Sequence, residues 1–249
     1  MTKDLLWRGM LAGILAALLA TLFARVYAEP LVDRAIAFEA SHESHEAQAG
    51  MHGGHDDDAA EAPVSRATQK SLGLATAAVL YGAALGGIFS LVFAYCYGRV
   101  GRIGPRTLAL LISVLGFAIV AIVPALKYPP NPPAVGHGDT IQLRTAAYFA
   151  MIAVSIVALV VAGRVRTMLA GRWGAFNAVV GAVAAYILVV ALAQIGLPRV
   201  DEVPGDFPAS LLWDFRVTSL GMQLILWVAI GLGFGWMAER RLRRDAAPR

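Results

Sequence analysis

The chain has 249 residues, of which 58% are apolar and 15% are charged, and its mean hydropathy is +0.63. A soluble globular domain is about half apolar and about a quarter charged, because water must wet its surface. The shortage of charge therefore excludes a soluble globular protein and indicates an integral membrane protein. The single cysteine, Cys96, excludes an intramolecular disulfide.

Long stretches without a charged residue indicate where the chain crosses the membrane, because a charge at the bilayer centre costs about 3 kcal/mol or more. A spanning helix needs about 20 apolar residues to cross roughly 30 Å of hydrocarbon. The first stretch is short, and it reaches this length only if Arg8 and Arg25 extend their charged ends to the surface. The sequence predicts an all-α bundle forming one membrane domain over residues 1–249. Its six expected spans are 9–24, 71–98, 107–126, 145–163, 173–198 and 217–238.

Pairs of small residues four apart recur in these stretches, as at Gly9/Gly13 and Gly82/Gly86. Such pairs allow the backbones of two helices to approach closely, where lipid gives no hydrophobic reason to associate. The simpler interpretation is that glycine and alanine are common in spanning helices, and it holds for at least half of the pairs.

The charges outside the spans predict the orientation. One side of the membrane receives 13 basic residues and three acidic ones, and the other receives eight basic and 14 acidic residues. Short basic loops stay in the cytoplasm, so both termini are expected there. The basic balance then reflects topology, and it gives no reason to expect a nucleic-acid partner.

The first stretch also has the layout of a cleavable signal peptide, with basic residues, an apolar core and Val26-Tyr27-Ala28. Arg25 close to the cleavage point and Pro30 just after it argue against cleavage. We expect the helix to be retained; cleavage would leave five spans.

The chemistry lies in the first outer loop, residues 29–70, which is rich in histidine and acidic residues and too polar to bury a core. We expect disorder or a mobile, irregular arm there. His42 and His45 are three residues apart, so one helical turn would place both on one face. His52 and His55 flank two glycines, which allow the chain to fold back. Asp56 and Asp57 follow directly.

Imidazole with carboxylate support suits cobalt, nickel, zinc or copper ions. The sequence predicts that this arm binds a divalent transition metal, more as a collecting arm than as a rigid cage. The affinity should fall with pH, because ligation needs the neutral imidazole. The alternative is a solvated acidic loop whose histidines only titrate.

Two further outer segments carry candidate entrance or gate residues. Four prolines around Asn131 stiffen the backbone after the third span and would hold His137, a further candidate metal ligand, and Asp139 near an entrance. A plain turn is the equal alternative. A short interfacial helix from Pro208 should lead into the last span; Asp214 and Arg216 lie two apart in it and cannot pair on one face. For these two, a structural cap is the favoured role.

No nucleotide-binding P-loop and no hydrolase or metalloprotease motif is present, so we do not expect an enzyme. The span interiors hold no acidic, basic or histidine residue, and their polar groups include Ser155 and Gln194, with Met151 as a soft ligand. Transporters that couple to protons usually carry ionisable groups there. The chain is therefore expected to need a partner or a second copy to complete a path.

Three features resemble the CbtA family of cobalamin-regulated cobalt transporter subunits. They are the opening span Arg8–Ala24 with the histidine-bearing loop, the run from Lys127 to Gly136 (KYPPNPPAVG), and the run from Trp213 to Ser219 (WDFRVTS). The resemblance implies a bacterial inner-membrane protein that takes up cobalt for cobalamin synthesis. It also implies a small single-span, histidine-bearing partner, CbtB, and no catalytic residues.

We therefore expect a cobalt importer with no permanently bound cofactor, embedded in the lipid bilayer with a CbtB-like partner or as a homo-oligomer. Its ligands would be His42, His45, His52, His55, Asp56, Asp57 and His137. Two alternatives stay open: a permease for nickel, zinc or copper, and a membrane metal-binding accessory protein that does not transport.

Overall fold

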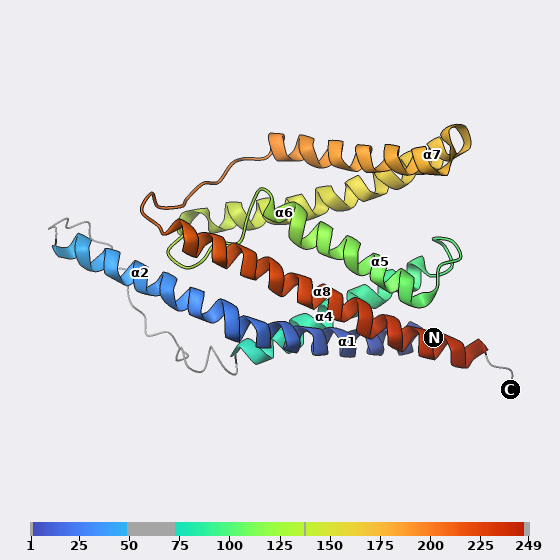
Figure 1. Cartoon of the computed structure of the whole chain (residues 1–249), viewed down its shortest axis with the longest axis horizontal. Helices are drawn as coiled ribbons and strands as arrows, with labels where there is room; N and C mark the ends of the chain where they lie inside the picture. The colour runs from blue at the N-terminus through green and yellow to red at the C-terminus, as the bar shows by residue number, and fades with distance from the viewer. Residues whose placement is uncertain (1, 49–72, 137, 247–249) are drawn as a thin grey trace. The chain divides into compact units, whose positions relative to one another are not determined.

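The computed structural model describes residues 2–48, 73–136 and 138–246, without the side chains of 43–48, 245 and 246. Every regular element in these ranges is helical, which confirms the all-α prediction (Figure 1). In chain order they are α1 (Thr2–Phe23), η1 (Ala24–Ala28), α2 (Glu29–Gln48), α4 (Leu74–Cys96), α5 (Pro105–Phe117), η3 (Ala118–Ile122), α6 (Val123–Ala125), η4 (Gly138–Thr140), α7 (Ile141–Gly196) and α8 (Ala209–Ala246).

Among the described residues, five helical runs are long and apolar enough to cross a membrane. The fourth run, Gly138–Gly196, covers two of the six stretches predicted from sequence. It is not one straight helix, because Gly174 within α7 has a φ of 77°. Figure 1 shows α7 as two arms that fold back on each other. The number of crossings and the side of the termini stay predictions.

Contacts divide the chain into two compact units, described separately below. Unit 1 comprises Met1–Gly116, Pro132–Ala134 and Ala209–Arg249, and unit 2 comprises Phe117–Asn131 and Val135–Pro208.

In unit 1, α1 packs on α4 through glycines. A Cβ atom added to Gly82 would lie 2.5 Å from the carbonyl oxygen of Gly13, and one added to Gly86 would collide with the carbonyl oxygen of Gly9. The two backbones are therefore in direct contact, as in other membrane helix pairs with small residues four apart. Of the two interpretations left open by the sequence, close helix packing is the one that holds for these two glycine pairs.

Helix α8 completes unit 1 through aromatic and polar contacts. Phe234 is fully buried and meets the rings of Phe89 and Phe93 edge-on, at 5.4 and 5.0 Å between centroids. The hydroxyl of Ser113 in α5 donates a hydrogen bond of 2.5 Å to the carbonyl oxygen of Trp227. The predicted helix from Pro208 into the last span is observed as the continuous α8.

The first helix continues beyond the predicted span. Helices α1, η1 and α2 form one helical run in Figure 1, so the irregular arm expected from residue 29 onward is wrong for residues 29–48. Proline lacks an N–H and breaks a helix interior, but it is tolerated in a first turn. Pro30 is the second residue of α2 and follows the wider π-helical turn η1, so the helix resumes around it.

Candidate functional site

Unit 2 contains a set of hydrogen bonds to backbone carbonyls that prolines leave short of donors. Pro124 follows the π-helical turn η3 and has no N–H to offer to the carbonyl of Val120, four residues earlier. The hydroxyl of Tyr148, in the first arm of α7, donates to this oxygen at 2.8 Å. The carbonyl that Pro124 leaves open thus accepts a hydrogen bond that connects α7 to the end of the preceding span.

The second arm of α7 ends in the same way. Residue 198 is proline, so the carbonyl of Gln194 cannot receive the N–H four residues on, and the ammonium of Lys127 donates to it instead. A cation is favourable at this position, because the C-terminus of a helix carries partial negative charge. The Gln194 side-chain amide donates to the oxygen of Val123 at 3.3 Å, and the Tyr128 hydroxyl donates to that of Pro198 at 2.7 Å.

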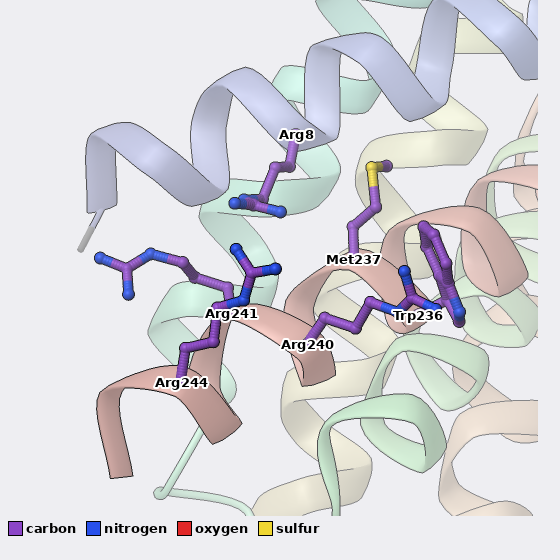
Figure 2. Close-up of a pocket in the computed structure, with 6 residues that line it drawn as sticks. All are labelled: Arg8, Trp236, Met237, Arg240, Arg241 and Arg244. Carbon is purple, nitrogen blue, oxygen red and sulfur yellow. The ribbon is translucent and has the colours of Figure 1, made fainter. Parts of the chain in front are cut away.

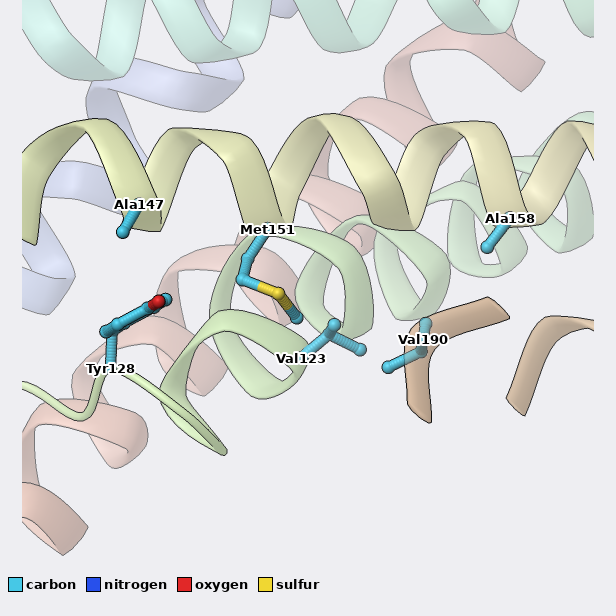
Figure 3. Close-up of a cluster of buried hydrophobic side chains, with 6 residues drawn as sticks. All are labelled: Val123, Tyr128, Ala147, Met151, Ala158 and Val190. Atoms are coloured by element: carbon cyan, nitrogen blue, oxygen red, sulfur yellow. The ribbon is translucent and has the colours of Figure 1, made fainter. Parts of the chain in front are cut away.

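Between these contacts lies a small buried cluster (Figure 3). Met151 is fully buried and directed toward Val123. One helical turn further on, the hydroxyl of Ser155, also fully buried, shares a 2.6 Å hydrogen bond with the hydroxyl of Tyr186 in the other arm. Burial raises the pKa of Tyr128 above its ordinary value of 10.0, so this phenol stays a neutral donor. The other cluster members are Ala147, Ala158 and Val190.

Arg144 of unit 2 forms an ion pair and also packs against Gly136, the last residue of the proline-rich run. The Nε of Arg144 lies 3.5 Å from a carboxylate oxygen of Glu202, and the side chains are 28% and 10% exposed. A Cβ atom on Gly136 would lie 2.8 Å from the guanidinium carbon of Arg144, and the φ of Gly136 is 116°. Only glycine meets both demands without strain, so Gly136 lets the guanidinium lie against the backbone.

Of the predicted metal ligands, His42 is the one whose side chain the structure describes. His42 lies in α2, half-buried, with its ring 4.3 Å from that of Phe38. His45 follows it by three positions in the same helix, as predicted, but its side chain lies outside the described set. In the part of the chain that the structure describes, no three histidine, cysteine or acidic side chains gather in one place. Outside the described residues lie His52, His55, Asp56, Asp57 and His137.

The predicted entrance and gate residues fall into different units. Asn131 is half-buried in unit 2, where Asp139 is exposed in the short helix η4. Asp214, exposed, and Arg216, half-buried, lie near the start of α8 in unit 1. A gate role for these residues stays a prediction.

The family model described as "Probable cobalt transporter subunit (CbtA)" matches residues 2–239, which is nearly the whole chain. The chain belongs to the CbtA family. It is thus a multi-pass membrane protein of a family described as a probable cobalt transporter subunit, and the word subunit implies a partner. No curated protein and no solved structure matches it.

Within this CbtA chain, the proline-rich run that suggested the family has an observable structural role. Lys127 and Tyr128 donate to the end of α7, and Gly136 accommodates Arg144. This run therefore connects elements of unit 2 that lie about 70 residues apart, rather than serving only as a turn after the third span.

Sequence reasoning found part of this arrangement. It named Met151, Ser155 and Gln194 as unusual groups within spans, but it did not single out Tyr148 or the Arg144–Glu202 pair. Pro124 and Pro198 carried a usable signal. Because proline has no N–H, each one leaves the carbonyl oxygen four residues earlier without its helical donor. What this signal does not predict is which distant donor fills that acceptor.

Proposed function

We propose that this protein imports divalent cobalt, that the α2 arm and the loop after it collect the ion outside the membrane, and that the helices pass it inward. The observation that carries the proposal is the length of the first helical run. Thr2–His42 has 41 residues, so it extends about 60 Å. That is twice the roughly 30 Å of bilayer hydrocarbon, which leaves the histidine-bearing end beyond the span.

The position of His42 and His45 supports a collecting role. Residues three apart lie on one face of a helix, and both belong to α2. In the proposed site they act with His52, His55, Asp56 and Asp57 of the following loop, and His137 forms part of the approach. Imidazoles from two separate segments and exchangeable carboxylates make a weak site, which suits a group that must release its ion.

The test is accumulation of radiolabelled cobalt in cells that lack their own uptake system, with the two histidines of α2 and the two of the following loop changed to alanine. We expect accumulation to fall at least fivefold at limiting cobalt and to recover at high cobalt, because a collecting arm raises the local ion concentration. The matched control is Ser41→Ala, an exposed change on the same helix. Unchanged accumulation together with unchanged cobalt binding would refute the collecting arm.

The same cells distinguish the alternatives. Ligand type does not separate cobalt from nickel, zinc or copper, so unlabelled ions are added as competitors, and a stronger block by one of them identifies a permease for that ion. Expression alone and beside the small CbtB-like subunit tests the partner. If neither gives accumulation although the purified protein binds cobalt, the protein is a metal-binding accessory subunit.

A further inference from the structure

A pocket of about 190 Å³ lies in unit 1 between the first and last helices of the chain (Figure 2). Arg8 contributes from α1, and Trp236, Met237, Arg240, Arg241 and Arg244 contribute from α8. Figure 2 shows the guanidinium groups of Arg8 and Arg244 extending toward each other from the two helices. Four arginines thus line one cavity.

The negative charge nearby is already engaged. Asp4 pairs with Arg241 at 3.1 Å, and Glu239 pairs with Arg106 at 2.6 Å and with Arg243 at 3.1 Å. Arg240 lies 3.8 Å above the ring of Trp236. Asp4 therefore offsets one of the four positive charges of the pocket, and among the described side chains no carboxylate lines the pocket itself.

The type and depth of these residues indicate which anion fits. The guanidinium fork matches the oxygens of a phosphate in a bidentate way, which a lysine ammonium cannot do. Arg8 directly precedes the first apolar stretch and Trp236 lies in the last turns of the final one. These are the depths at which lipid phosphates meet the ends of spanning helices, and Trp236 and Met237 give the pocket an apolar wall.

We infer that this pocket binds a phosphate group, and that in the membrane this group belongs to the headgroup of an anionic phospholipid bridging α1 and α8. A general excess of basic residues at the cytoplasmic surface would explain arginines spread along the loops. It does not require Arg8 of α1 to line the same cavity as three arginines of α8, which lie more than 220 residues further along the sequence.

The test uses the full chain, purified in a neutral detergent at physiological salt. Retention of phosphatidylglycerol is measured by native mass spectrometry, with phosphatidylcholine and inorganic phosphate as parallel probes. We expect phosphatidylglycerol to bind at least tenfold more tightly than phosphatidylcholine. The variant R8Q/R244Q should lose this preference, and R8K/R244K, which keeps the charge but not the fork, should lose part of it.

The control R102Q/R166Q removes the same charge from two exposed arginines that do not line the pocket, and it should bind as the unmodified chain does. Inorganic phosphate that saturates the pocket and displaces the lipid would make a soluble phosphate compound the ligand instead. Equal binding to R8Q/R244Q and the unmodified chain, or equal losses in the pocket and control variants, would overturn the inference. Cobalt takes no part in these measurements, so their result is independent of the transport proposal.

Discussion

The contacts inside unit 1 and those inside unit 2 are of opposite kinds. In unit 1, α1 and α4 meet backbone to backbone at glycines, and no side chain intervenes between Gly13 and Gly82. In unit 2, prolines interrupt the helices, and side chains from distant positions donate to the carbonyls of Val120 and Gln194. One unit depends on the absence of side chains and the other on their hydrogen-bonding groups.

This difference indicates where the protein can change. A glycine contact has one geometry and fails when the helices separate. A carbonyl held by a tyrosine or a lysine can exchange that donor for another, including a cation, which is how interrupted helices serve transporters. We therefore expect unit 1 to be a fixed scaffold and unit 2 to be the part that responds to an ion.

The largest effect should come from breaking the glycine contact with Gly82→Leu. The new side chain would overlap the Gly13 backbone, which cannot move aside within a helix, so we expect a loss of more than about 3 kcal/mol of stability. Thermal unfolding in detergent and the yield of monodisperse protein measure it. Gly87→Ala is the control, because its Cβ would find the nearest side-chain atom at a comfortable 3.6 Å. If Gly82→Leu is as stable as Gly87→Ala, the observed contact between α1 and α4 is wrong.

A smaller effect is expected from Tyr148→Phe in unit 2. The change removes one hydroxyl and leaves the Val120 oxygen short of a donor, which should cost about 1 kcal/mol. Tyr27→Phe, at an exposed site, should cost nothing measurable. Cobalt accumulation should change only for Tyr148→Phe if unit 2 is the responsive part. If the two variants accumulate cobalt equally, the expectation that unit 2 responds to the ion is wrong.

The smallest effect concerns pH and Tyr128. Its folded-state pKa is raised by burial, so its stabilising contribution is fully present below the unfolded value of about 10 and is lost as the pH rises through the folded value. Tyr128→Phe should be less stable than the unmodified chain at pH 8, and the gap should narrow above about pH 10. Unfolding temperatures at both pH values measure this. A stability difference that widens as the pH rises would contradict the assignment of the Tyr128 hydroxyl as a hydrogen-bond donor.

The sequence predicted the apolar helices well, because the cost of a charge in lipid leaves a signal in every span. The glycine pairs were also readable, since small residues four apart lie on one helix face. It was less successful at residues 29–48, where a polar composition suggested an irregular arm. Composition excludes a separate core there, but alanine and glutamate favour a helix, and its first part packs in unit 1 through the buried Leu31 and Ala35.

The sequence by itself determined that the protein lies in the membrane, that it is helical, and that its motifs match a cobalt transporter subunit family. These properties follow from local composition and spacing. Only the tertiary structure decided that Arg8 meets the end of α8, that Lys127 meets Gln194, and that Tyr148 serves Val120. Such pairings join residues up to 236 positions apart (Arg8 to Arg244). They depend on which helices become neighbours, and no local pattern of one chain specifies that.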